Sequence, residues 1–130
     1  MSLMKFREPN RVRWQGSRPA HDGTQIIGYN FATNDNAAVY TALAGETAFV
    51  HYMDLTWTAG ANPGKARLQV WNAVPAVVST IMDNQVLATS VGGKVVSLTY
   101  PLELIEGWSI RVVSTALLLR ADGCILGWVE

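Results

Sequence analysis

Side chains able to do chemistry are few and widely spaced in this sequence. The two histidines are His21 and His51, and Asp54 follows His51 closely enough to suggest an acid–base pair. Residues 47–58, however, alternate apolar and polar side chains as a half-buried strand does, and positions three apart on a strand lie on opposite faces. We therefore expect His51 to be a hydrogen-bonded core histidine, and we expect no catalytic residue.

The sequence also has few residues in the patterns that bind metals or cofactors. Asn34, Asp35 and Asn36 offer oxygen ligands for calcium, but the glycine and glutamate of a calcium-binding loop do not follow them. A cupin-like metal enzyme needs clustered histidines, which this chain does not have. Gly92 and Gly93 precede no helix that could cradle a phosphate, so we expect neither a metal nor a cofactor.

The single cysteine, Cys124, lies in an apolar run and cannot form an internal disulfide. We interpret it as a small buried hydrophobe, which fits assembly in a reducing cytoplasm. No apolar run reaches the roughly 18 residues of a membrane span, and charges stand where a signal peptide would need its apolar stretch. We expect a soluble protein with no membrane partner.

Short strands with turn signals at roughly ten-residue intervals organise the rest of the chain. The predicted strands cover residues 24–33, 37–44, 47–58, 65–72, 77–81, 85–90, 94–100, 107–114, 116–121 and 124–129. Such spacing is typical of a sandwich or barrel, and its evenness favours an all-β fold of two antiparallel sheets of the jelly-roll type. An immunoglobulin-like sandwich is the alternative.

The last two predicted strands carry apolar side chains on both parities. Asp122-Gly123 between them is a typical tight-turn dipeptide, so we predict a terminal hairpin. Hydrophobic residues make up 49% of the chain and charged residues 15%, which is little charge for the surface of a small monomer. One side of the hairpin should therefore contact another subunit. The residues predicted in this oligomer interface are Leu117, Leu118, Leu119, Ile125 and Val129.

The first 23 residues differ in composition from the rest. Pro9, Gly16 and Pro19 interrupt any periodic pattern, so we expect an extended basic arm over residues 1–23 and a β-sandwich domain over residues 24–130. Within residues 1–20, Glu8 is the one acid beside five basic side chains, although the whole chain has no net charge.

Three interpretations of the arm stay open: a solvated tail, a strap on a neighbouring subunit or another protein, and a nucleic-acid contact. Aromatic and guanidinium groups are the types that anchor protein interfaces, whereas a neutral chain with an acidic body is unsuited to binding phosphates. The arm residues that we expect to bind a partner are Phe6, Arg7, Arg11, Arg13, Trp14 and Arg18.

Trp71 falls on the polar parity of its predicted strand, with Lys65, Arg67 and Gln69. An outward tryptophan can be half-buried by a loop, contact another subunit or stack on a sugar, and these three interpretations stay open. Trp71 is thus a possible surface contact. A carbohydrate-binding module of a tail or adhesin protein, with Trp71 or Tyr52 as its stacking ring, is the alternative to an assembly function.

The end of the chain resembles a known family. Residues 107–114 read Gly-Trp-Ser-Ile-Arg-Val-Val-Ser, and an apolar segment, Asp-Gly and a final Ile-Leu-Gly-Trp-Val-Glu follow. This pattern is similar to the end of small jelly-roll decoration, or cement, proteins of tailed phages. The resemblance implies a non-enzymatic homotrimer without a cofactor on the capsid surface of the virion. It also implies that the arm reaches the major capsid protein or a neighbouring decoration subunit.

Overall fold

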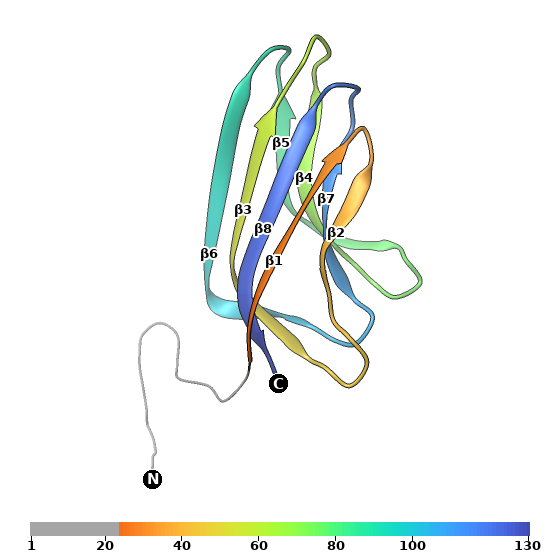
Figure 1. Ribbon diagram of the computed structural model, residues 1–130, viewed down its shortest axis with the longest axis vertical. Coiled ribbons are helices and arrows are strands. Elements are labelled where there is room, and N and C mark those ends of the chain that lie inside the picture. The colour runs from red at the N-terminus through yellow and green to blue at the C-terminus, as the bar shows by residue number, and fades with distance from the viewer. Residues whose placement is uncertain (1–23) are drawn as a thin grey trace.

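The structure, a computed structural model, describes residues 24–130 as eight strands (Figure 1). In these residues no helix is long and apolar enough to cross a membrane. The strands are β1 (Thr24–Thr33), β2 (Asn36–Thr41), β3 (Ala48–Thr58), β4 (Gly64–Trp71), β5 (Val77–Val86), β6 (Val91–Leu104), β7 (Ser109–Ser114) and β8 (Arg120–Val129).

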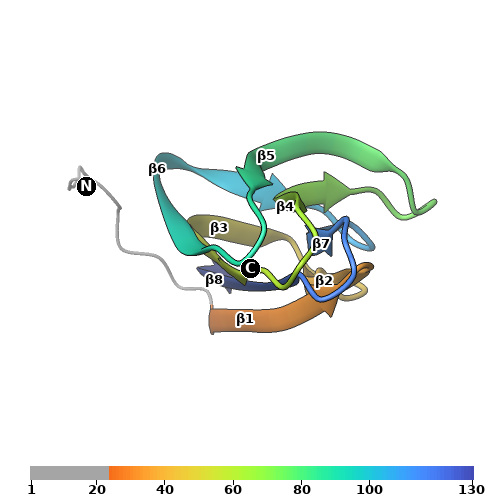
Figure 2. The same cartoon turned by 90° about the horizontal axis from the view of Figure 1, so that it is seen from above.

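The strands form two four-stranded antiparallel sheets that stack as layers (Figure 2). Sheet A has the order β1-β8-β3-β6, and sheet B has the order β2-β7-β4-β5. Each odd-numbered strand and the strand that follows it lie in different sheets, which is the wrapping of a jelly roll. The predicted two-sheet antiparallel sandwich is confirmed.

The core lies between the two sheets and follows the alternation of the sequence. In β4, Ala66, Leu68 and Val70 point inward, as their parity predicts. Each large apolar side chain that is fully buried contributes about 1.5–3 kcal/mol to folding. The largest side chains buried in this way are Met53, Leu55, Leu68, Leu104, Ile110, Leu119 and Ile125.

The predicted terminal hairpin is wrong, because Asp122 and Gly123 lie inside the continuous strand β8. Gly123 does not have the positive φ that a tight turn would require. It faces sheet B so closely that an added Cβ would stand 3.0 Å from side-chain atoms of Leu68 and Val39. The glycine therefore permits close packing of the sheets, and residues 115–119 connect β7 to β8 instead.

Two further turn signals also lie within strands. Asp83 continues β5 and accepts a hydrogen bond from Arg67 Nε at 3.0 Å, so the two strands predicted over residues 77–90 are largely one. Gly92 lies in β6 beneath Trp57, whose Cζ2 atom would be 2.7 Å from an added Cβ. The chain turns between them, where Thr89 has a φ of 59°.

His51 lies at an irregularity in β3. The register of β3 with both neighbouring strands shifts between Val50 and Tyr52, so an extra residue is accommodated there. The bulge reverses the parity, and as a result Phe49 faces outward while Met53 faces the core. His51 is half-buried, 5.9 Å from the Trp128 ring, and is not the core residue that the alternation predicts.

Leu118, in the connection from β7 to β8, has a strained backbone conformation that should lower the free energy of unfolding. Its φ of 60° lies in the left-handed region, where a side chain costs roughly 1–2 kcal/mol, and its side chain is exposed. Leu118→Gly should therefore raise the free energy of unfolding by about 0.5–1 kcal/mol, after the greater flexibility of unfolded glycine is subtracted. Urea titration measures this gain. Leu118→Ala keeps the strain and should show none of it; equal gains in both variants would contradict the explanation.

Candidate functional site: an aromatic face on sheet A

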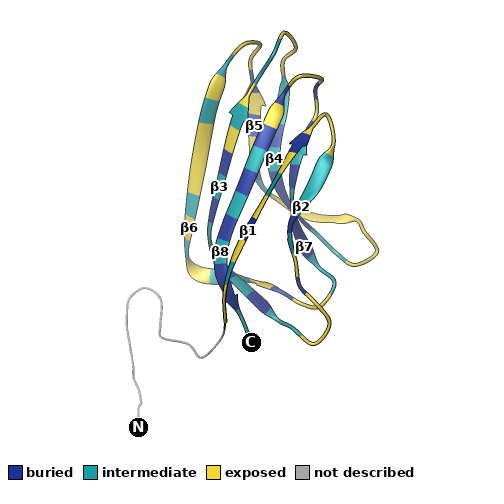
Figure 3. Cartoon of the chain, in the orientation of Figure 1, coloured by how far each residue is buried: buried dark blue, intermediate teal, exposed yellow. Residues whose placement is uncertain are grey.

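The outer face of sheet A carries adjoining aromatic and aliphatic side chains. The register aligns Ile27, Leu126 and Tyr52 across three strands and places Tyr29 beside them on β1. We call this surface the aromatic face and define it as Ile27, Tyr29, Phe31, Tyr52, Val95 and Leu126. Figure 3 shows exposed residues along the edge strands β1 and β6, with half-buried and buried residues alternating on β8.

Strand β1 accounts for much of this surface. Its alternation in the sequence would suggest that the apolar side chains face the core, but they do not. Its apolar parity faces solvent, with Ile27 75%, Tyr29 56% and Phe31 44% exposed. The inward parity has a glycine at its centre, because an added Cβ at Gly28 would stand 2.6 Å from the backbone oxygen of Val39. Two aromatic rings and an isoleucine on the solvent side of β1, opposite a buried glycine, are the signal that locates the site.

One end of the aromatic face is held by a polar cluster. Asp122 accepts hydrogen bonds from Tyr29 Oη at 2.6 Å and from Arg120 Nε at 3.0 Å. Arg120 also lies over the ring of Phe31, with its Cζ atom 3.9 Å from the ring centroid. Burial opposes ionisation of Asp122, but the bonds from Arg120 and Tyr29 outweigh it and lower the pKa of the carboxyl. The cluster fixes two exposed rings and keeps a charged carboxylate beside them.

Toward the middle of the face, Asp54 influences two titratable groups. Burial and the nearby Asp54 carboxylate raise the pKa of the Tyr52 hydroxyl, which donates to Asp54 Oδ2 at 3.4 Å. Burial and the same carboxylate raise the pKa of the half-buried Cys124 thiol. Neither group is activated as a nucleophile by these shifts, because both favour the protonated form.

The outer face of sheet A is also acidic. Asp54, Asp122 and Glu103 share it with Arg120, so carboxylates outnumber the guanidinium group. At the opposite end from the polar cluster, Trp128 stacks on Phe49 with ring centroids 5.3 Å apart. The surface thus combines aromatic rings with net negative charge.

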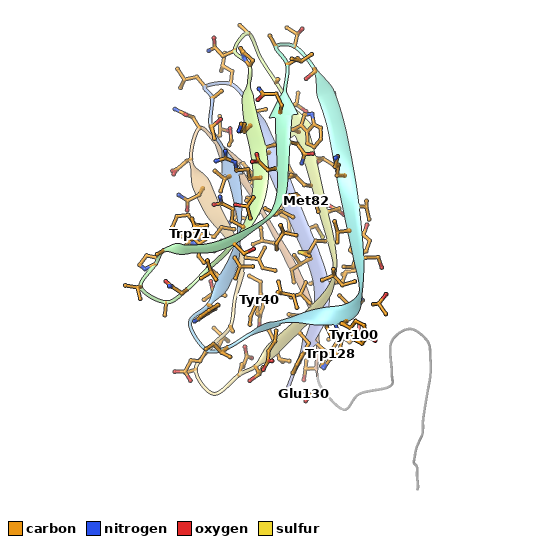
Figure 4. All side chains as sticks on the ribbon, turned by 180° about the vertical axis from the view of Figure 1, so that it is seen from behind. Tyr40, Trp71, Met82, Tyr100, Trp128 and Glu130 are labelled. Carbon is orange, nitrogen blue, oxygen red and sulfur yellow. The ribbon has the colours of Figure 1, made fainter. Side chains whose placement is uncertain are left out.

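The outer face of sheet B has a different character, with polar side chains bonded to one another. Arg111 Nη1 donates to Asn36 Oδ1 at 2.8 Å, and Gln69 Nε2 donates to Thr80 Oγ1 at 3.1 Å. Trp71 is half-buried on this sheet (Figure 4). Its Nε1 donates to Gln69 Oε1 at 3.1 Å, and Arg111 Cζ lies 5.0 Å from its ring centroid. These contacts account for its partial burial.

The structure separates the residues predicted for the oligomer interface. Leu119 and Ile125 have no exposed surface and belong to the core, so they cannot contact another subunit in this fold. Val129 is half-buried against the same core. Leu117 and Leu118 are 62% and 67% exposed at the β7–β8 connection. The prediction is wrong for Leu119 and Ile125 because it assumed a hairpin with two uncovered sides, whereas β8 lies between β1 and β3. For Leu117, Leu118 and Val129 it stays a prediction.

The predicted partner-binding arm lies outside the described residues, and with it Phe6, Arg7, Arg11, Arg13, Trp14 and Arg18. Within the described part, no group of three or more His, Cys, Asp or Glu side chains is placed to hold a metal ion.

Comparison with known proteins gives one kind of match. No family model and no curated protein matches the chain. Among solved structures, the chain is similar to the crystal structure of a pentameric capsid protein isolated from metagenomic phage sequences, with 15% identity and a TM-score of 0.40. The alignment covers 80% of this chain and 60% of the capsid protein, so the chain spans less than two thirds of that protein's length.

Proposed function

We propose that this chain is a non-enzymatic structural protein of a phage virion. In this proposal it is a trimeric decoration, or cement, protein that stabilises the capsid from its outer surface. The observation that carries the assembly function is the aromatic face. The similarity of residues 107–130 to the ends of phage decoration proteins supports the virion assignment.

The aromatic face has the chemistry of a protein interface. Tyrosine and arginine side chains often dominate the binding energy of protein interfaces, and phenylalanine is enriched there. Tyr29, Phe31 and Arg120 occur together here. Adjoining exposed apolar groups cost free energy in water, about 25 cal/mol for each Å² that association would remove. The polar, internally bonded outer face of sheet B has no comparable gain from association, so sheet A is the side that we assign to assembly.

Trimerisation would give the assembly its strength on a capsid. A trimer presents three copies of every contact, so each contact with the major capsid protein or a neighbouring decoration subunit can be weak while the whole dissociates rarely. The alternative, a carbohydrate-binding module, would use Trp71 or Tyr52. Both rings are half-buried, and both side chains are bonded to neighbours in their own sheet, so neither favours that function.

Ile27→Asp should convert the trimer to a monomer. A carboxylate in a desolvated interface costs several kcal/mol, whereas Ile27 is exposed in the single subunit and its replacement leaves the core intact. Multi-angle light scattering gives the mass, and circular dichroism checks the fold. The control is Val77→Asp, which places the same charge at a residue 50% exposed on sheet B and should leave the trimer unchanged.

A wild-type protein that stays monomeric at high concentration would refute the assembly function. A trimeric Ile27→Asp variant would show that the aromatic face is not the surface through which the protein assembles. Electron microscopy of virions that carry the protein tests the location: copies on the outer surface are expected, and copies inside the capsid or in the tail would contradict it.

A further inference from the structure

We propose that the aromatic face binds the N-terminal arm, residues 1–23, of a neighbouring copy. This inference rests on the proposed assembly function and names the occupant of its interface. An arm-to-face contact joins two different surfaces, and such contacts close into rings when the rotation between copies permits. A three-membered ring in which each arm reaches the next copy satisfies all three faces equally.

Charge selects sheet A over sheet B as the receiving surface. Within residues 1–20 the basic side chains are Lys5, Arg7, Arg11, Arg13 and Arg18, and Glu8 is the one acid. The outer face of sheet A presents Asp54, Asp122 and Glu103 against Arg120. The outer face of sheet B presents Lys65, Arg67 and Arg111 against Asp83. An arm of positive charge is therefore attracted to sheet A and repelled by sheet B.

The aromatic face also matches the side-chain types of the arm. Guanidinium groups bind the faces of tyrosine and phenylalanine rings, and Arg120 already lies in this way over Phe31 at 3.9 Å. The arm contains the same combination of groups, because Phe6 is next to Arg7 and Trp14 is next to Arg13. Arginines from the arm can stack on the exposed Tyr29 ring while the rings of the arm cover the exposed Ile27 and Val95.

The length and origin of the arm favour the face of a neighbour. The described chain begins at Thr24, opposite Val129, so the start of edge strand β1 lies beside the C-terminal end of β8 (Figure 1). Twenty-three residues would reach about 75 Å at full extension, more than twice the roughly 33 Å of the ten-residue strand β1. An arm on its own face would have to reverse direction just before Thr24, because β1 already runs along that face. A neighbouring face requires no such reversal.

Photo-crosslinking of the full chain tests the contact. Trp14 is replaced by p-benzoylphenylalanine, an aromatic residue that attaches to nearby C–H bonds when irradiated. Covalently linked dimers should appear on a denaturing gel, and mass spectrometry should map the attachment to Ile27, Leu126 or their neighbours on the aromatic face. Attachment to β4 or β5, attachment within one chain only, or no more product than in a denatured sample would overturn the inference.

A matched pair of variants tests the charge argument. Asp54→Asn removes a carboxylate from the receiving surface and should lower the yield of linked dimer about two- to fivefold, as expected for one partly exposed ion pair. Asp83→Asn makes the same change on sheet B and should leave the yield unchanged. Equal yields in both variants would contradict the selection of sheet A by charge.

The experiments distinguish failure of the arm contact from failure of the proposed assembly function. A trimer in light scattering, combined with attachment away from the aromatic face, would retain the assembly function and reject the arm as its means. A monomer under all conditions would reject both.

Discussion

Gly127→Ala is expected to destabilise the protein by about 3 kcal/mol or more, which places it among the severe single substitutions. Gly127 is buried in β8, and a Cβ added there would overlap the backbone oxygen of Phe49 in β3. The overlapping atom is backbone, so no side-chain rotation relieves it, and the β3–β8 pairing must open. Urea denaturation should show a much lower midpoint or no folded baseline.

Gly93→Ala is the control for this variant. Gly93 lies on edge strand β6, where the nearest atom to an added Cβ is Thr56 Cγ2 at 3.1 Å. The threonine side chain can move, and the next contact, with the backbone oxygen of Leu55 at 3.2 Å, is tight without overlapping. The free energy of unfolding should therefore change by less than about 1 kcal/mol. Similar midpoints for Gly127→Ala and the wild type would show that β8 does not approach β3 as closely as described.

Ile125→Ala is expected to cost about 2–5 kcal/mol of stability, because it removes a fully buried side chain and leaves a cavity. Thermal unfolding of the purified protein measures the loss. The variant also decides whether Ile125 belongs to the core or to a subunit interface. Loss from the core lowers the stability of the subunit at every protein concentration, whereas loss from an interface would lower stability only where the oligomer forms.

Leu117→Ala is the matched exposed truncation. Leu117 is 62% exposed, so its replacement should change the free energy of unfolding by no more than about 0.5 kcal/mol. Equal losses in Ile125→Ala and Leu117→Ala would contradict the burial pattern of β8 and return the two residues to a common surface.

The two outer faces of the domain differ in chemistry, because only the outer face of sheet A is both acidic and aromatic. Polar side chains on the outer face of sheet B bond to one another, so exposing this face to water costs little free energy. The outer face of sheet A exposes aromatic rings, and burying them against another protein would be favourable. A subunit with one such face can assemble through it and still expose a soluble surface. The proposed arm contact would cover the aromatic face without creating a second apolar surface.

The sequence by itself determined the local elements. The ranges predicted for β1, β3 and β4 agree with the structure to within one residue at either end, because alternation of side chains is a property of each strand alone. The spacing of these strands was enough to predict a two-sheet sandwich. The arm's charge and aromatic content are also legible in the sequence, although their structural role is not.

Tertiary structure alone decided which glycines turn the chain and which face of β1 is buried. Gly92 and Gly123 resemble turn residues but remain in strands because Trp57 and the side chains of sheet B approach them. Ile27 resembles a core residue but faces water because Val39 leaves no space for a side chain at Gly28. These outcomes depend on atoms distant in the sequence, and a local pattern carries no information about how closely two sheets approach.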